Sequence, residues 1–236
     1  MYLYSLWGKS EDRMKFFKLS AAMCAILLLT ACAVEEEIYD PEPAVTVSPL
    51  AEENFLEPVT DFSWARQFPP EKVMLHFSSA VVLQRDDPYD LEAVRKIFIA
   101  GEISVHYIID RDGKIHCWIP EDRVAWHAGA GEFGGDARYT NAMNQYAIGI
   151  EVLAIGSERD MAQYLTPAEY AALPQELLGF TDAQYDAIAA LVQDLCTRYA
   201  IPMDRAHIIG HEEYSPTKTD PGELFSWERI VPDLPK

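Results

Sequence analysis

Basic residues are scarce in this sequence. The 236 residues include 19 lysine and arginine residues against 38 aspartate and glutamate residues, which gives a formal net charge of −19 and an isoelectric point near 4.6. A nucleic-acid groove needs a basic stripe that neutralises phosphates. We therefore exclude nucleic acid as a partner. Internal repeats are also absent, and the length suits one α/β domain with a tail rather than two full domains.

Long apolar runs are scarce too, since the run from Leu19 to Ala31 is too short to span a bilayer. Lys15 and Lys18 precede it, so the segment has the charged and apolar regions of a secretory signal. Its end, Leu29-Thr30-Ala31-Cys32, resembles the bacterial lipobox, in which the cysteine becomes lipidated. A buried amphipathic helix is the alternative, and the apolar character on every face of the run disfavours it.

We predict three parts: a lipoprotein signal peptide over residues 1–32 with Cys32 as the lipid anchor, a tether over 33–58, and one domain over 59–236. The tether "AVEEEIYDPEPAVTVSPLAEENFLEP" mixes carboxylates and prolines with little periodicity, which is typical of an extended linker. The expected location is extracytoplasmic and membrane-anchored in a bacterium, with the choice of membrane left open.

Cysteine is rare, with four residues in the chain. Cys24 would leave with the signal and Cys32 would carry the lipid, so only Cys117 and Cys196 belong to the domain. A disulfide between these two and a pair of free thiols both stay open, because Cys196 lies in an apolar stripe where a buried thiol is equally at home.

The remaining sequence alternates strand and helix patterns. Apolar runs predict buried strands, and apolar residues at helical spacing predict amphipathic helices. The predicted elements are a strand over Lys72–Ser78, a helix around 89–99, a hairpin across Asp112-Gly113, a strand from Ala147, a helix from Thr181 or Asp182 to before Pro202, and a last strand "AHIIGH". This order favours an α/β fold with a mixed β-sheet flanked by helices.

The six histidines do not all suit one site. A two-residue hairpin loop at Asp112-Gly113 would place His106 on one face with Cys117, and His116 on the opposite face with Tyr107. We therefore expect His106 and His116 to be structural.

His76 and His211 stand at or near the ends of buried strands. After His211 comes "GHEEYSPTKTDPG", whose two prolines predict an ordered loop rather than a helix, and which contains Asp220. Two imidazoles and one carboxylate form a catalytic rather than a structural zinc set, because the fourth position stays open. Zn²⁺ in such a set lowers the pKa of a water and polarises a carbonyl.

Glu151 interrupts the apolar strand "AIGIEVLAIG". A buried carboxylate is costly unless it has a partner or a task, and burial would raise its pKa into the useful range of a general base. A solvent-facing position on an edge strand is the alternative reading, and the spacing alone leaves both open.

Five motifs, in order, carry a resemblance to a known family: "LHFS", "SVHYIIDRDGKI", "AWHAG", "NQYAIGIE" and "GHEEYSPTKTDPG". From about Val73 to Trp227 the chain resembles the type-2 N-acetylmuramoyl-L-alanine amidases, a zinc family that includes the AmpD-like amidases and is similar in fold to the peptidoglycan-recognition proteins. The chain departs from the family pattern at Ser78, at Ala147 and in a shorter loop before Asp220. None of these departures removes a candidate ligand.

The resemblance implies that His76, His211 and Asp220 bind zinc and that Glu151 is the acid/base. It also implies that Lys218 stabilises an oxyanion, which suits a cation so near a ligand. By the same resemblance, Trp126 and His127 in "AWHAG" belong to the substrate cleft. Asn144 matches the asparagine that leads the family's strand, where it either contacts substrate or only holds the loop.

The predicted function is zinc-dependent hydrolysis of the amide between N-acetylmuramic acid and L-alanine in peptidoglycan or muropeptides, by a monomer. The main alternative is a non-catalytic peptidoglycan-binding lipoprotein. A structural lipoprotein is a third possibility, which zinc analysis would separate. A zinc peptidase acting on the stem peptide is chemically close, and the ligands alone do not distinguish it from the amidase.

Overall fold

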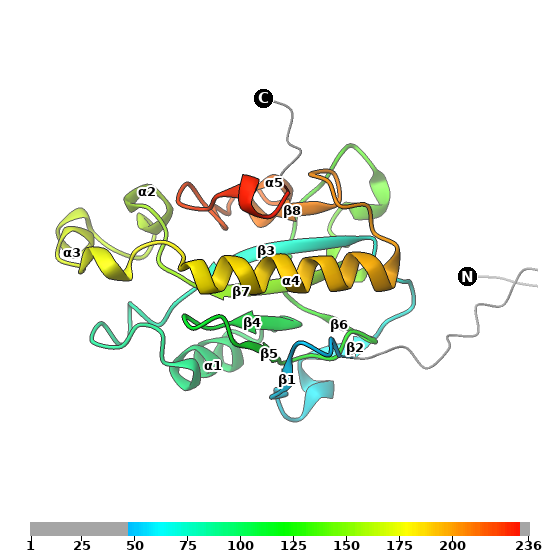
Figure 1. Cartoon of the computed structure of the whole chain (residues 1–236), viewed down its shortest axis with the longest axis horizontal. Coiled ribbons are helices and arrows are strands. Elements are labelled where there is room, and N and C mark those ends of the chain that lie inside the picture. The colour runs from blue at the N-terminus through cyan, green and yellow to red at the C-terminus, as the bar shows by residue number, and fades with distance from the viewer. Residues whose placement is uncertain (1–46, 232–236) are drawn as a thin grey trace, which may run out of the picture. The chain divides into compact units, whose positions relative to one another are not determined.

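A computed structural model describes residues 47–231 (Figure 1). The predicted signal peptide, Cys32 and most of the tether lie outside these residues. Within the part that is described, no helix is long and apolar enough to cross a bilayer.

The main sheet has six strands in the order β1-β5-β4-β7-β3-β8. Neighbouring strands run parallel except β4 and β5, which form an antiparallel pair. A separate antiparallel pair joins β2 (Ser63–Ala65) and β6 (Arg123–Ala125). The prediction of a mixed sheet is confirmed. In sheet order, the strands are β1 (Glu52–Glu53), β5 (Ile115–Cys117), β4 (Tyr107–Ile109), β7 (Ala147–Leu153), β3 (Lys72–Ser78) and β8 (Ile208–Gly210).

Helices connect and cover the strands. The longest, α4, begins where the Thr181 hydroxyl accepts a hydrogen bond from the backbone N–H of Gln184, and it ends where Ala200 turns left-handed with φ of 53°. Pro202 then follows, as the sequence predicted. The helices are α1 (Leu91–Ala100), α2 (Glu158–Met161), α3 (Pro167–Ala171), α4 (Asp182–Tyr199) and α5 (His211–Tyr214). Short 3₁₀ turns occur at Val59–Asp61, Ala137–Tyr139, Met143–Gln145, Gln175–Leu177 and Trp227–Arg229.

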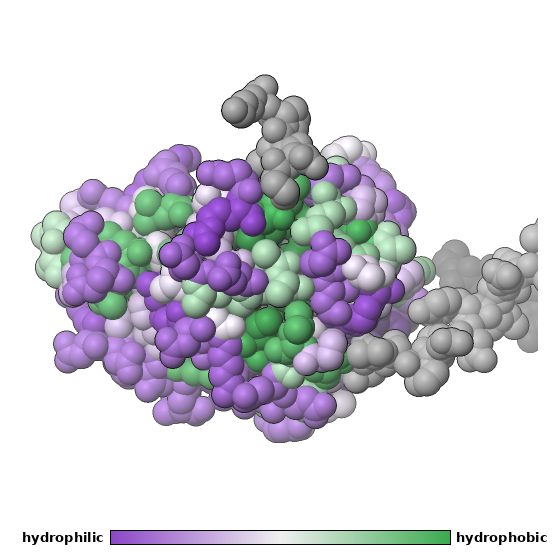
Figure 2. All heavy atoms as spheres, viewed as in Figure 1, coloured by the Kyte–Doolittle hydropathy of each residue, from purple (hydrophilic) through white to green (hydrophobic). Residues whose placement is uncertain are grey.

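The two faces of the main sheet are covered differently. Helix α4 lies along one face (Figure 1), where Leu191 packs in one apolar cluster with Leu75 of β3 and Ile150 of β7. Helix α1 packs on the other face, where its Phe98 joins a cluster with Ile108 of β4. The outer side of α4 faces solvent among mixed hydrophilic and hydrophobic residues (Figure 2).

The hairpin between β4 and β5 differs from the prediction. Ile109 pairs with Ile115, and the backbone N–H of Asp110 donates to the carbonyl oxygen of Lys114 at 3.0 Å, so a loop of three residues remains, with Gly113 last at φ of +80°. His116 consequently opposes Ile108, and Cys117 opposes Tyr107, which reverses the predicted faces of both residues. A three-residue loop that ends in a left-handed glycine is a common alternative to the two-residue turn, and one extra residue flips every side chain beyond it.

The packed domain begins earlier than the predicted boundary at residue 58. β1 pairs with β5, the backbone N–H of Ser48 donates to the Tyr107 hydroxyl at 2.8 Å, and Leu56 is fully buried. The acidic composition suggested a tether because composition describes only the side chains and not the hydrogen bonds that the backbone can form. Strand pairing at a sheet edge, however, uses the backbone and leaves the carboxylates of β1 exposed.

Cys117 and Cys196 are both free and both buried. The structure therefore decides in favour of two thiols. Burial raises the pKa of each thiol, that of Cys196 to about 11, so both stay protonated and unreactive near neutral pH.

Candidate active site

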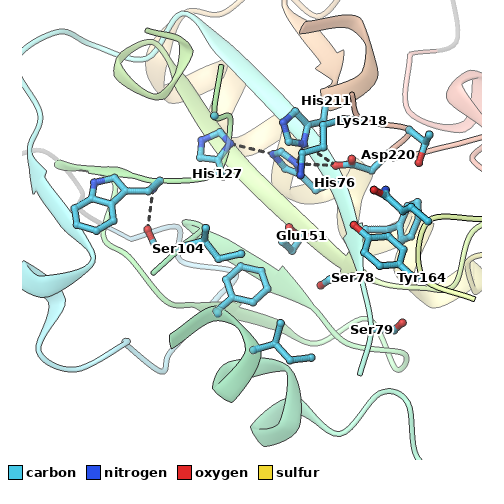
Figure 3. Close-up of a pocket in the computed structure, with 18 of the residues that line it drawn as sticks. His76, Ser78, Ser79, Ser104, His127, Glu151, Tyr164, His211, Lys218 and Asp220 are labelled. Atoms are coloured by element: carbon cyan, nitrogen blue, oxygen red, sulfur yellow. Dashed lines mark hydrogen bonds and ion pairs between the residues drawn. The ribbon is translucent and has the colours of Figure 1, made fainter. Parts of the chain in front are cut away.

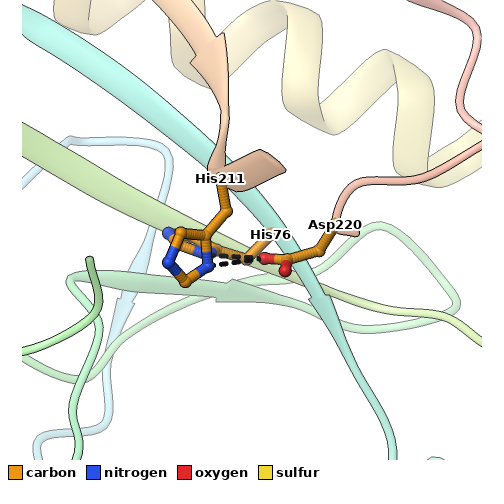
Figure 4. A group of neighbouring side chains, drawn as sticks. All are labelled: His76, His211 and Asp220. Atoms are coloured by element: carbon orange, nitrogen blue, oxygen red, sulfur yellow. Dashed lines mark hydrogen bonds and ion pairs between the residues drawn. The ribbon is translucent and has the colours of Figure 1, made fainter. Parts of the chain in front are cut away.

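Three side chains converge near the carboxyl-terminal ends of β3 and β8: His76 from within β3, His211 directly after β8, and Asp220 from the loop that follows (Figure 4). Nδ1 of His76 lies 2.8 Å from Oδ2 of Asp220 and 3.0 Å from Nδ1 of His211, and the latter lies 3.0 Å from the same carboxylate oxygen. His76 and His211 are buried. The structure thus brings together the three residues that the sequence proposed as ligands.

Strand pairing produces this convergence. β3 and β8 are parallel neighbours with Leu75 beside Gly210, so the next residues, His76 within β3 and His211 at the start of α5, lie at adjacent positions. Gly210 also lets the loop return closely, since a Cβ at this position would lie 2.7 Å from the Pro221 ring. The expected loop after β8 is partly wrong, because its first four residues form the one-turn helix α5, and both prolines come only after that turn.

The donor set suits zinc. Two imidazole nitrogens and one carboxylate oxygen, all within 4.8 Å of one another, match a three-ligand catalytic site. Burial, followed by the neighbouring His211, lowers the pKa of His76 to about 4, which keeps the imidazole in the neutral form that binds metals. Burial acts to raise the pKa of Asp220, but hydrogen bonds from His211 and His76 outweigh it and hold that pKa below its usual range.

Glu151 lies beside His76. The two residues are register partners in the parallel pair of β7 and β3, on the face opposite α4. β7 is an interior strand and Glu151 is 9% exposed, so the solvent-facing alternative is wrong. Burial, followed by the charge of Asp220, raises the pKa of Glu151 to about 8, while Ser78 and Lys218 act in the opposite direction.

A pocket of about 420 Å³ surrounds these groups (Figure 3). It gathers every predicted site residue apart from Cys32, namely His76, Trp126, His127, Asn144, Glu151, His211, Lys218 and Asp220. The close-up shows Lys218 beside Asp220, and Glu151 below the two histidines.

The sequence did not reveal the outer walls of the pocket. One wall is apolar and comes from α1 and the loops near it: Val81, Val82, Ile97, Phe98 and Ile103. On another side stands Tyr164, half-exposed, from the chain after α2. The amphipathic pattern of α1 could indicate a buried face but not which cavity it lines. No motif marked Tyr164.

The profile of the N-acetylmuramoyl-L-alanine amidase family, Amidase_2, matches residues 66–223. The chain belongs to this family. The matched span contains all three candidate metal ligands, from His76 to Asp220, together with Glu151.

Curated relatives agree with this assignment. The chain is 35% identical over 129 residues to the 1,6-anhydro-N-acetylmuramyl-L-alanine amidase AmpD of Citrobacter freundii, an alignment that covers 54% of this chain and 55% of the relative. It is 30% identical over 139 residues to the N-acetylmuramoyl-L-alanine amidase AmiD of Escherichia coli K12, which covers 55% of this chain and 44% of that one. The chain therefore matches about half the length of these relatives.

Solved structures show the same fold. A selenomethionine AmpD structure superposes with a TM-score of 0.58 at 26% identity, covering 79% of this chain and 95% of that one. AmiD from E. coli, in complex with the substrate anhydro-N-acetylmuramic acid-L-Ala-D-γ-Glu-L-Lys, superposes with a TM-score of 0.51 at 24% identity, covering 70% and 58%.

Proposed function

We propose that this protein is a zinc-dependent amidase that hydrolyses the amide between N-acetylmuramic acid and L-alanine in peptidoglycan fragments. The observation that carries the proposal is the buried set of His76, His211 and Asp220 with Glu151 as the register neighbour of His76, in a pocket within the family span. AmpD and AmiD, which are named as amidases of N-acetylmuramyl-L-alanine, support the same bond and substrate class.

His76, His211 and Asp220 would hold the zinc, which supplies a water of lowered pKa and polarises the amide carbonyl. Glu151 then acts as the acid/base. Burial raises the pKa of Glu151, which makes its carboxylate a better base towards the attacking water, and its acid form then delivers a proton to the departing amine of L-alanine. Lys218 lines the same pocket, and its positive charge would stabilise the carbonyl oxygen as that oxygen becomes negative.

The walls of the pocket support a substrate with both apolar and polar parts. Trp126 and the apolar wall near α1 present hydrocarbon surface, while Tyr164 and Lys218 present polar groups on another side. A muropeptide offers matching parts, because its sugar rings and lactyl methyl group have apolar faces and its peptide is polar. A single chain supplies all these groups, which supports activity as a monomer.

A non-catalytic peptidoglycan-binding protein is the competing function. Such a protein needs no buried carboxylate beside a metal set, and an isolated carboxylate there only destabilises the fold. The burial of Glu151 and the raised pKa therefore favour the enzyme.

We further propose that the protein works outside the cytoplasm, anchored by a lipid on Cys32, because the lipobox-like residues 29–32 follow a signal-like segment. Expression of the full chain and of Cys32→Ser in a bacterium, followed by fractionation and mass spectrometry, tests this. The proposal requires acylated Cys32 in the membrane fraction and release of the variant. An unmodified, soluble wild-type chain would exclude it.

The activity itself is tested with the full chain and purified muropeptides. The experiment compares untreated protein, protein treated with a chelator, and treated protein to which Zn²⁺ is returned, with products identified by mass spectrometry. We expect free stem peptide beginning at L-alanine, lost on chelation and restored by zinc. Intact muropeptide in the presence of bound zinc would favour the binding protein, and cleavage within the peptide would indicate a peptidase.

A further inference from the structure

In each candidate ligand histidine, the ring nitrogen that faces away from Asp220, Nε2, also has a hydrogen-bond partner. Nε2 of His76 lies 3.0 Å from Nδ1 of His127, and Nε2 of His211 donates to the carbonyl oxygen of Ala128 at 2.9 Å. His127 and Ala128 are consecutive residues, so one short segment contacts both imidazoles. Figure 3 shows the first contact as a dashed line from His127 to His76.

The backbone of this segment is fixed by one side chain. Oδ1 of Asn144 accepts hydrogen bonds from the backbone N–H of His127 at 3.1 Å and of Ala128 at 2.8 Å. Just before them, the backbone N–H of Trp126 donates to the Ser104 hydroxyl at 2.8 Å. Asn144 belongs to the 3₁₀ turn that leads into β7, so the segment is tied to the strand that carries Glu151.

The contacts define how the protons are placed. His76 and His211 meet Asp220 through Nδ1, so a metal bound there takes the Nδ1 lone pair and leaves the proton on Nε2. His76 must then donate from Nε2, and Nδ1 of His127 must accept. Metal-ligating histidines commonly hand their second N–H to such an acceptor, which fixes the orientation of the ring.

Close packing leaves the His127 ring little freedom. It stands edge-on to His76 and to His106, with ring centroids 5.1 Å and 5.7 Å away. Its other side abuts the backbone of β7 at Gly149, where a Cβ would lie 2.6 Å from a ring carbon.

We propose that His127 and Ala128, clamped by Asn144, form a positioning segment that orients both ligand histidines. The side chains of His127 and Asn144 line the pocket, but the main role of each is to orient the candidate metal ligands and not to bind substrate. Trp126 stays a candidate substrate-facing residue, because it lines the pocket and its ring packs against Trp64, with ring centroids 5.7 Å apart. The inference rests on the proposed zinc site.

Zinc affinity of the full chain gives the decisive readout, measured by competition with a chromophoric chelator. Asparagine and leucine have almost the same shape, but only asparagine can offer an acceptor near the position of Nδ1. We expect His127→Leu to weaken zinc binding by about 10- to 100-fold, and His127→Asn to recover most of that loss. His116→Leu is the matched control, since His116 is also buried but contacts Asp110 instead, and its zinc affinity should equal that of the wild type.

Asn144→Leu tests the clamp without touching either imidazole. It should weaken zinc binding in the same direction, and the double variant with His127→Leu should lose less than the product of the two single effects, because both act through one segment. Independent, multiplicative effects would contradict a shared segment.

Nitrogen-15 NMR of the zinc-loaded wild type reads the tautomer directly. The inference requires His127 to be unprotonated at Nδ1 and protonated at Nε2. Wild-type affinity in His127→Leu, or a proton on Nδ1 of His127, would overturn it. A wild-type chain that binds no zinc would instead refute the proposed function, so the two failures are distinguishable.

Discussion

Strands β3 and β7 carry two faces that share a backbone and differ in chemistry. Leu75 and Ile150 point into the apolar cluster beneath α4, whereas their neighbours His76 and Glu151 point into the pocket. All four side chains are buried, so burial does not distinguish the faces. The difference lies in the cover: α4 fills one face with hydrocarbon, and α1 covers the other only in part, which leaves the pocket of about 420 Å³.

Residues that pack in the core and residues that line the pocket therefore alternate along these strands. Side chains of successive strand residues point to opposite faces. Substitutions at adjacent positions should therefore affect either stability or activity, and four experiments test whether these two effects are separate.

The largest effect is expected at Glu151. Glu151→Gln keeps the size of the side chain and removes its acid/base function, so kcat for muropeptide hydrolysis should fall by about 10²- to 10⁴-fold. The thermal midpoint should be equal or higher, because a neutral amide is easier to bury than a carboxylate. Steady-state kinetics and thermal unfolding check both. A wild-type rate with zinc bound would remove Glu151 from the mechanism.

Ile150→Ala probes the opposite face one residue away. It removes a fully buried side chain from the cluster beneath α4 and should lower the free energy of unfolding by about 2–5 kcal/mol. Hydrolysis per folded molecule should be unchanged, because this side chain points away from the pocket. Urea unfolding and activity below the transition are the measurements, and a specific loss of activity without a loss of stability would contradict the separation.

Gly149→Ala tests how tightly the pocket face is packed. The new methyl group would overlap the His127 ring, so the ring must move and its contact with His76 must lengthen. We expect zinc affinity to fall by about 10-fold. The control is Ala147→Gly on the same strand, which creates no overlap and should leave zinc affinity unchanged.

The smallest expected effect is a pH dependence of the metal-free protein. Burial raises the pKa of Glu151 to about 8, so the folded chain holds a proton that the unfolded chain has already released, and stability from this group falls as pH rises towards 8. The lowered pKa of His76 affects stability only below pH 6.5, the ordinary pKa of histidine, and there it makes stability rise with pH. Between pH 6.5 and 8 the wild type should therefore lose stability relative to Glu151→Gln, as measured by denaturant unfolding with a chelator. If stability depended on pH in the same way for the wild type and Glu151→Gln, Glu151 would have an ordinary pKa.

Some parts of the fold were predictable because they depend on local pattern. The bounds of β3 follow from one apolar run, and the start of α4 follows from Thr181 followed by helical periodicity. The register of the hairpin was not predictable, because the sequence "DRDGK" suits a two-residue loop and a three-residue loop equally well. The start of the domain was missed because β1 docks through its backbone.

The candidate site divides in the same way. Residue types and motif order were enough to propose the three ligands and Glu151, and the structure places all four together. The apolar wall near α1 and Tyr164 were not foreseen, because each reaches the pocket from a distant part of the chain.

The residues alone establish which donor groups are available, since side-chain chemistry belongs to the residue, and the motifs give the order of these donors along the chain. Long-range packing sets which atom of each donor faces the others, how deeply Glu151 is buried, and the contact of His127 with His76 across 51 positions of chain. These features depend on long-range neighbours, and such neighbours exist only once the parallel strands have paired and the segment before β7 has closed over their ends.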